Sequence, residues 1–477
     1  VTGVQTCALP ICVVATFGHW RVPGSAPNEF IKCPFPGACL GAANPKQEGK
    51  YFNKTWANGR WVEYNFDYAK HRLKEGCNTY YGFKAGSRLC HACVDEFKRL
   101  GRNRCAGCPT QGQNVGLMLL AVLLLIAGGV AVVWMAIKDA GKAEESEIIR
   151  KITFNFLQVA ALAAGFPLHW PQELETLFDF QGAISTAGEH LLNPDCSVRG
   201  VDAASLFYAK QIGYALTPMG LAFVIFLIWK VYSLVAGIEW SNRMKVETHT
   251  PKDKMVVTIC VLLYFFWPTS LKQTFQIFSC RSIGAGDLLY LMADFEQPCY
   301  VGRHLTYVIF VGVTQIILYA IGLPVLVFVF LWRHRDELNK PVVKFRYGLF
   351  FAGFRQEKYY WECVVALRKE STVLLAVFGP QMGIPMLAHV ALLVFQVQIL
   401  VQLIGHPYEP QQIKLQVLDV TSIVVCWGTM WSGFFFYSPR PPSQKPALQF
   451  LTVLVVLVNA LYMLVLLYSM CSETCRE

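Results

Sequence analysis

Long apolar runs constrain this sequence more than any other feature. Residues 115–137, "VGLMLLAVLLLIAGGVAVVWMAI", are apolar on every face and are followed by Lys138. A hydrocarbon core about 30 Å thick needs about 20 such residues per helix. Only 16% of the 477 residues are charged and 54% are hydrophobic, whereas about 25% are charged in an ordinary soluble domain. The sequence therefore predicts an all-α polytopic membrane protein.

Nine segments qualify as predicted spans, and the second is the weakest. In 148–167, Lys151, Asn155 and Gln158 form one polar face at i, i+4 and i+7. This segment either spans with that face turned into the bundle or lies flat at the membrane surface. The predicted spans are 115–137, 148–167, 213–238, 255–278, 305–332, 359–379, 382–405, 415–437 and 448–470.

Basic residues in the loops predict the orientation. We place residues 13–110 outside and let the spans alternate. The inside loops and the C-terminal tail then hold 17 Lys and Arg, whereas the outside loops between spans hold 6, with residues 13–110 left out of the count. This excess follows the positive-inside rule, so we expect the tail 471–477 in the cytoplasm and the protein in the plasma membrane. The same excess accounts for the net charge of +10. We therefore expect the lipid bilayer, and no nucleic acid, as a partner.

The first residues need separate treatment. Residues 1–11, "VTGVQTCALPI", look like the translation of a sequencing adapter joined to a truncated transcript. They have neither the basic start nor the long apolar stretch of a signal peptide. We expect them to be foreign to the protein, and its natural N-terminus to be missing.

Residues 13–110 form a polar segment rich in cysteine. Its last four cysteines make C-x2-C, a spacer and a second C-x2-C. Such pairs either bind zinc through four thiolates or form disulfides in a small extracellular module. We favour disulfides, because a glycosylation sequon at Asn53 and the adjacent span fit an extracellular position. The disulfide candidates of the whole chain are Cys33, Cys39, Cys77, Cys90, Cys93, Cys105, Cys108, Cys196, Cys280 and Cys299.

Two cysteine pairs lie close to predicted membrane ends. Cys280 and Cys299 fall on the outer side and enclose a short loop, so we predict a disulfide worth about 3 kcal/mol between them. Cys196 is the rival partner for either one. Cys471 and Cys475 fall on the inner side, where they are either acylated or remain two reduced thiols.

The sixth predicted span carries four ionisable residues. Charges are costly in lipid and usually face a bundle interior or a water-filled path. We predict pairing across helices; the alternative is that Arg368 and Lys369 extend to the cytoplasmic surface. Amides of the seventh span and Asp419 of the eighth are the expected neighbours. The predicted intramembrane cluster is Glu362, Arg368, Lys369, Glu370, Gln396, Gln402 and Asp419.

Catalytic motifs are missing from the sequence. It has no phosphate-binding loop, no G-x-S-x-G and no H-E-x-x-H. We therefore expect no enzymatic activity, no cofactor and no bound metal.

Several phrases resemble a family of protist and algal surface proteins. Members of this family have a cysteine-rich ectodomain followed by a transmembrane region similar to that of transient-receptor-potential (TRP-like) proteins. The cysteine-rich segment is itself similar to ephrin-receptor-like or EGF-like modules, in "CNTYYGFKAGSRLCHACVDEFKRLGRNRCAGCP" (77–109). The membrane phrases are "ITFNFLQVAAL…HWP" (152–170), "FFWPTSLKQTFQIFSCRSI" (265–283), "AIGLPVLVFVFLWRHR" (320–335), "RYGLFFAGFRQEKYYWECVVALRKE" (346–370) and "HPYEP" (406–410).

The resemblance implies a cation channel or a mechanosensitive membrane protein, with cations as partners. Two other functions stay open. One is a surface receptor or adhesion protein whose ectodomain binds an extracellular partner and whose bundle relays a signal. The other is a lipid-handling membrane protein. A homo-oligomer is compatible with all three.

Overall fold

The structure is a computed structural model of the chain. It describes residues 4–7, 12–23, 29–42, 44, 55–57, 60–62, 75–100, 104–139, 145–163, 166, 168, 170–185, 196, 198, 201–237, 249–284, 288–437 and 445–476. Asn53, the predicted glycosylation site, lies outside them.

The chain divides into two compact units, which are described separately. Unit 1 comprises Val1–Leu119, Asn193–Gln211 and Gln276–Phe310. Unit 2 comprises Leu120–Leu192, Ile212–Phe275 and Val311–Glu477. Unit 1 therefore combines the cysteine-rich segment with two segments that come from between predicted spans.

Short antiparallel strands build unit 1. In the part of the chain that the structure describes, they form five two-stranded sheets and the three-stranded sheet β11-β12-β13. Two-stranded ribbons are only marginally stable in water, so other contacts must hold them. The strands are β1 (Val4–Cys7), β2 (Cys12–Ala15), β3 (His19–Arg21), β4 (Phe30–Lys32), β5 (Cys39–Leu40), β6 (Thr55–Ala57), β7 (Arg60–Val62), β8 (Gly76–Cys77), β9 (Phe97–Leu100), β10 (Arg104–Gly107), β11 (Cys280–Ser282), β12 (Leu289–Leu291) and β13 (Asp294–Pro298).

The first strand falls within the residues that the sequence sets apart as foreign. β1 pairs with β2 in antiparallel register, Val4 opposite Ala15. The pairing does not test where residues 1–11 come from, so their origin stays a prediction.

Among the described residues, five disulfides hold unit 1 together, and they use every cysteine that the sequence nominated. Cys280 and Cys299 are joined as predicted, whereas Cys196, the predicted rival, is bonded to Cys108. The two C-x2-C pairs contribute to three different bonds, which leaves no four-thiolate zinc site there. The bonds are Cys33–Cys39, Cys77–Cys90, Cys93–Cys105, Cys108–Cys196 and Cys280–Cys299.

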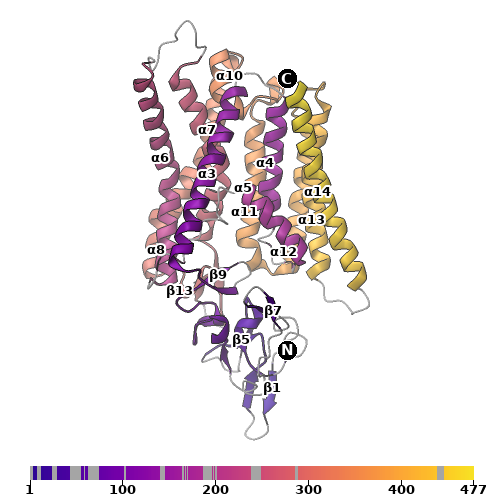
Figure 1. The fold of residues 1–477 in the computed structure, drawn as a ribbon. Coiled ribbons are helices and arrows are strands. Elements are labelled where there is room, and N and C mark those ends of the chain that lie inside the picture. Colours follow the sequence, from indigo (N-terminus) through magenta and orange to yellow (C-terminus); the bar gives the residue numbers. More distant parts are fainter. Residues whose placement is uncertain are drawn as a thin grey trace. The chain divides into compact units, whose positions relative to one another are not determined.

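Helices make up most of the described part of unit 2 (Figure 1). Several of these helices contain residues assigned to both units. Two π-helical segments, Val308–Val313 and Ile316–Gly322, lie between α8 and α9. The helices are α3 (Gln111–Asp139), α4 (Glu145–Ala163), α5 (Gln172–Ser185), α6 (Ala203–Val235), α7 (Pro251–Gln276), α8 (Gly302–Tyr307), α9 (Leu323–Arg333), α10 (Pro341–Tyr347), α11 (Trp361–Phe378), α12 (Ile384–Gly405), α13 (Ile413–Tyr437) and α14 (Lys445–Arg476).

Seven helical segments among the described residues are long and apolar enough to cross a membrane, so the chain is a multi-pass membrane protein. The predicted spans 148–167 and 359–379 correspond to α4 and α11, which are not among the seven. Their charged residues lower the hydropathy of both helices. Nine spans are thus not confirmed, and the two extra crossings stay predictions. The seven are Gln111–Lys138, Ala203–Val235, Pro251–Gln276, Gly302–Arg333, Ile384–Gly405, Ile413–Tyr437 and Pro446–Glu473.

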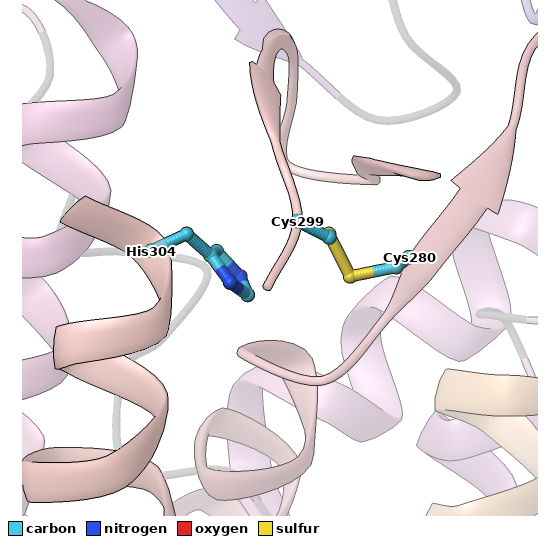
Figure 2. Close-up of side chains that lie close together, drawn as sticks. All are labelled: Cys280, Cys299 and His304. Carbon is cyan, nitrogen blue, oxygen red and sulfur yellow. A yellow bond between two sulfur atoms is a disulfide. The ribbon is translucent and has the colours of Figure 1, made fainter. Parts of the chain in front are cut away.

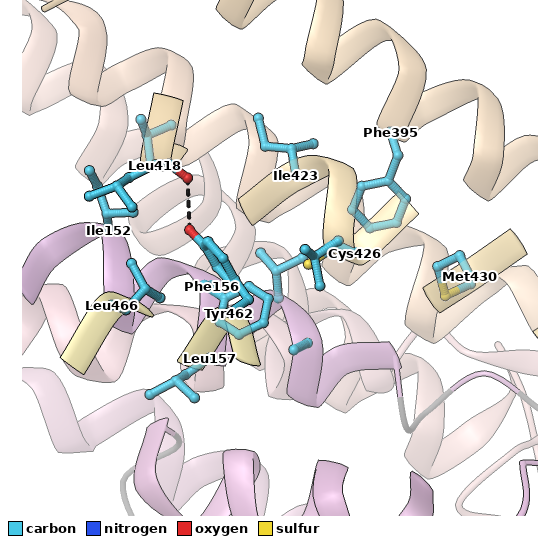
Figure 3. Close-up of a cluster of buried hydrophobic side chains, with 14 of the residues drawn as sticks. Ile152, Phe156, Leu157, Phe395, Leu418, Ile423, Cys426, Met430, Tyr462 and Leu466 are labelled. Carbon is cyan, nitrogen blue, oxygen red and sulfur yellow. Dashed lines mark hydrogen bonds between the residues drawn. The ribbon is translucent and has the colours of Figure 1, made fainter. Parts of the chain in front are cut away.

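α4, the weakest predicted span, is enclosed by other helices of unit 2. None of its described side chains is exposed. It packs against α5, α11, α13 and α14. Figure 3 shows its Ile152, Phe156 and Leu157 with labelled side chains of α13 and α14. In the same cluster, the Tyr462 hydroxyl donates to the backbone oxygen of Leu418 at 2.7 Å. Neighbouring helices, rather than lipid, therefore surround the polar residues of α4.

Candidate functional site

The candidate site is a group of charged and polar side chains buried inside unit 2, contributed by α4, α7, α11 and α13. α11 begins at Trp361, whose ring lies where a Cβ on Gly405 of α12 would be. The absence of that Cβ lets the two helices approach closely. Glu362 follows directly and is thereby fixed at the bundle interior. Lys369, seven residues later, lies on nearly the same helix face.

Glu362 forms an ion pair with a residue that the sequence did not assign to the cluster. Its carboxylate lies 2.5 Å from Nζ of Lys151 on α4, and both side chains are almost fully buried. The other carboxylate oxygen accepts a hydrogen bond of 3.0 Å from the Tyr264 hydroxyl of α7. Lys151 also donates to the backbone oxygen of Leu349 at 3.0 Å. Both charges are therefore paired and hydrogen-bonded, as burial requires.

Arg368 reaches a different helix. Its guanidinium donates to Asp419 of α13 at 3.2 Å. The other oxygen of that carboxylate accepts a bond of 3.1 Å from the hydroxyl of Tyr408, in the turn between α12 and α13. Burial, reinforced by the nearby carboxylate, raises the pKa of Tyr408 well above its ordinary value, so the phenol stays protonated and donates. Asp419, named from the sequence, is thus the partner of Arg368.

Lys369 is the least compensated charge of the site. Its side chain is only 2% exposed, and its Nζ lies 4.3 Å from the ring centroid of Tyr264. Among the described residues, no carboxylate oxygen lies within ion-pair distance of this ammonium group. A cation over an aromatic ring is attracted to the ring's negative face, which offsets part of the cost of burial. Neither Arg368 nor Lys369 extends to the surface, so that alternative is wrong.

Three predicted members of the cluster take no part in its two ion pairs. The Gln396 side chain is exposed, because it lies about 200° around α12 from Gln398, which does bond to the backbone oxygen of Arg368 at 3.3 Å. Glu370 is half-buried and makes no ion pair within the described chain. Gln402 is buried, and its backbone oxygen accepts a bond from the side chain of Gln416. Including Gln396 in the cluster was therefore wrong.

Sequence reasoning missed Lys151 and the two tyrosines as members of the site. Lys151 and Asn155 were visible as a polar face on a weak span, and Asn155 lies 2.9 Å from the Tyr264 hydroxyl. That face was the available signal, since a polar stripe in an apolar helix needs a polar partner. No pattern in the sequence linked it to Glu362, which lies far along the chain. Tyr264 and Tyr408 gave no signal, because aromatic residues are common in membrane helices and their ends.

The one group of three potential metal ligands in the described chain lies in unit 1. Figure 2 shows Cys280, Cys299 and His304, whose ligand atoms lie within 4.8 Å of one another. The two sulfur atoms are already joined to each other. Nδ1 of His304 accepts a bond of 3.0 Å from the Tyr300 backbone N–H, and Nε2 lies 3.1 Å from the Ile277 oxygen. In this oxidised form, every ligand atom has a structural partner.

Within unit 1, the cysteine-rich segment contacts the loop before α8. The Arg88 backbone N–H donates to Glu296 at 2.7 Å, and the Arg88 side chain forms an ion pair with the same carboxylate at 3.3 Å. Arg99 donates to the Ala293 oxygen at 2.8 Å. The rings of His91 and Phe295 lie 4.2 Å apart. The cysteine-rich segment is thus joined to one loop by these contacts and to the segment before α6 by Cys108–Cys196.

The fold and the site define a multi-pass membrane protein with a disulfide-rich N-terminal region. One similar protein is "Cysteine repeat modular protein A" of Toxoplasma gondii, 22% identical over 328 residues. The match covers 56% of this chain and 10% of that protein, so the chain spans about a tenth of its relative's length. No family model matches the chain, and no solved structure matches it. The TRP-like assignment therefore stays a prediction.

Proposed function

We propose that this protein is a cell-surface receptor or adhesion protein. Unit 1 would face the outside and bind a partner, and the helices would relay that event without enzymatic chemistry. One observation carries the proposal: the Cys108–Cys196 bond, which attaches the cysteine-rich segment to the residues that precede α6. A ligand that moves the segment would also act on the residues that lead into a candidate membrane-spanning helix.

The test uses the full chain in lipid nanodiscs, with hydrogen exchange read at the first turns of α6 and α8. Replacing both Cys108 and Cys196 by Ser should increase exchange at the start of α6. The control replaces Cys33 and Cys39, whose bond spans only 6 residues, and should change exchange only within residues 13–110, leaving the first turns of α6 and α8 unchanged. Unchanged exchange at α6 in the first variant would contradict the proposed coupling.

A binding assay tests the receptor function itself. Proteoliposomes that hold the full chain should adhere to cell surfaces severalfold more than protein-free liposomes. The variant without the Cys108–Cys196 bond should lose most of that adhesion, because its cysteine-rich segment is no longer cross-linked to the residues before α6. Adhesion equal to that of protein-free liposomes, from protein shown to be folded, would count against a receptor or adhesion protein.

Ion conduction is the second candidate, and the buried charges favour it. Lys151, Glu362, Arg368, Lys369 and Asp419 bring acids and bases from three helices into the bundle interior, where charged residues often mark an ion path. Liposomes loaded with a potassium-sensitive dye and holding the full chain should then show cation flux. Glu362→Gln and Asp419→Asn should alter that flux. Flux equal to that of empty liposomes argues against conduction and leaves the receptor proposal standing.

A further inference from the structure

The exposed face of α14 ends in two cysteines. Exposed side chains recur along this helix every three or four residues, a spacing that places them in one stripe. Most of the stripe is apolar, and in a membrane-spanning helix an exposed apolar stripe faces lipid. Its members are Leu457, Leu461, Leu464, Tyr468, Cys471 and Cys475.

The opposite face of the same turns is held against the bundle. Glu473, between the two cysteines, forms an ion pair with Lys414 of α13 at 2.5 Å and is largely buried. Leu466, two turns earlier on the same face, is fully buried. Residues two positions apart point about 200° apart around a helix. Cys471 and Cys475 therefore point away from the bundle, and the ion pair fixes that direction.

The length of α14 places the two thiols at the membrane boundary. A helix of 32 residues is about 48 Å long, which exceeds a hydrocarbon core of about 30 Å. Cys471 falls in the last turn of the candidate span Pro446–Glu473, and Cys475 follows it. Both thiols are free and exposed in the structure. The other described free cysteines, Cys260, Cys363 and Cys426, are buried or half-buried.

We propose that Cys471 and Cys475 are S-acylation sites that accept long-chain fatty acyl groups from acyl-coenzyme A. The cysteine thiolate attacks the thioester carbonyl, a new sulfur–carbon bond forms, and the bond to coenzyme A breaks. Coenzyme A leaves as a thiolate and takes up the proton that the cysteine lost. Because acyl-coenzyme A is a cytoplasmic donor, the inference rests on the proposed orientation, with the C-terminus inside. The acyl chains would continue the lipid-facing stripe of α14.

Thioester exchange on the full chain from eukaryotic cells tests the proposal. Free thiols are blocked, thioesters are cleaved with neutral hydroxylamine, and the released thiols are tagged with maleimide-polyethylene glycol to give a mass shift on a gel. Wild-type protein should shift by two tags, C471S and C475S by one tag each, and the double variant by none. C426A, which removes a buried thiol, should shift like wild type.

A second arm separates this proposal from the orientation. In intact cells, an impermeant maleimide should fail to label either cysteine after hydroxylamine treatment, and permeabilisation should allow labelling. Cysteines that lie inside but show no hydroxylamine-dependent shift would overturn acylation while leaving the orientation intact. Cysteines labelled from outside would overturn both, because no acyl-coenzyme A is available there.

Discussion

Lys151 and Lys369 are both buried ammonium groups, yet among the described residues only Lys151 forms an ion pair with a carboxylate. Removing one member of a buried pair costs about 3–5 kcal/mol, since it leaves an uncompensated charge. Removing an unpaired buried charge relieves that charge's desolvation instead. The two lysines should therefore respond in opposite ways to the same substitution.

Lys151→Met should lower the thermal midpoint and folded yield of the detergent-solubilised protein, with a loss of about 3–5 kcal/mol. Adding Glu362→Gln should restore much of it, because the double variant no longer leaves the buried carboxylate of Glu362 without the Lys151 charge. The exposed pair Lys340–Glu337, at 2.6 Å, supplies the control: Lys340→Met should cost less than about 1 kcal/mol. A double variant as unstable as the sum of the two singles would refute the Lys151–Glu362 pair.

Lys369→Met should be tolerated, with stability unchanged within about 1 kcal/mol or increased. Methionine keeps the length of the side chain and its contact with the Tyr264 ring but removes the buried charge. The comparison is the thermal midpoint of this variant against that of Lys151→Met, measured in the same detergent. A loss as large as that of Lys151→Met would mean that Lys369 has a strong anionic partner.

For single residues, the sequence predicted which charges are buried better than it predicted the partners of those charges. Glu362, Arg368, Lys369 and Asp419 follow from charge inside apolar runs, which has few explanations other than a protein interior. The partner of Glu362 is on α4, and helix-to-helix contacts depend on packing that no local pattern encodes. Gln396 was misplaced because an amide in a span can also face outward.

The first turn of α6 illustrates how helix ends are stabilised. Asp202 accepts a bond of 3.0 Å from the Ser205 backbone N–H and pairs with Arg303 at 3.1 Å. Hydrogen bonds from Ser205, followed by the Arg303 guanidinium, lower the pKa of Asp202 to about 2. A carboxyl group whose pKa is lower in the folded state stabilises the fold at pH values above its unfolded-state pKa of about 3.9. This stabilisation is lost as the pH falls toward about 2.

Asp202→Ala should therefore weaken the start of α6 by about 1 kcal/mol at neutral pH. Asp202→Asn should cost less, because the amide oxygen still accepts a bond from the Ser205 N–H. Hydrogen-exchange protection of residues 203–206 is the measurement. Between pH 5 and pH 2.5, protection should fall in the wild type and change little in Asp202→Asn; an equal fall in both proteins would exclude Asp202 as the cap.

Helices were predictable where apolar runs were long and uniform. The seven apolar spans match helices of the structure, although α6 begins at Ala203 rather than at 213. The residues 203–212 include polar side chains, so hydropathy alone placed the start too late. α5 was not foreseen, because it lies in a polar segment and hydropathy carries no signal for a short amphipathic helix.

The orientation of the whole molecule is a separate prediction. Basic residues favour a cytoplasmic C-terminus and an outer cysteine-rich segment. Epitope tags at both ends, followed by protease treatment of intact cells, should remove the N-terminal tag and spare the C-terminal one. Permeabilised cells, in which both tags should be cut, serve as the control. A C-terminal tag cut in intact cells would reverse the orientation.

Unit 1 was only partly predictable from the sequence. Disulfides were expected from an excess of cysteine in a small polar module, and the short loop predicted Cys280–Cys299. The remaining connectivity could not be deduced, because spacing does not determine pairing when many cysteines are present. The Cys108–Cys196 bond spans 88 residues, and only the folded structure brings its ends together.

Disulfide mapping of the native membrane form tests the central claim most directly, since the claim is that the cysteine-rich segment and the segment before α6 are one covalent unit. The protein is alkylated, digested without reduction and analysed by mass spectrometry. We predict a linked peptide pair that contains Cys108 and Cys196, and a second that contains Cys280 and Cys299. Cys196 recovered as an alkylated free thiol, or joined to Cys280 or Cys299, would contradict the account.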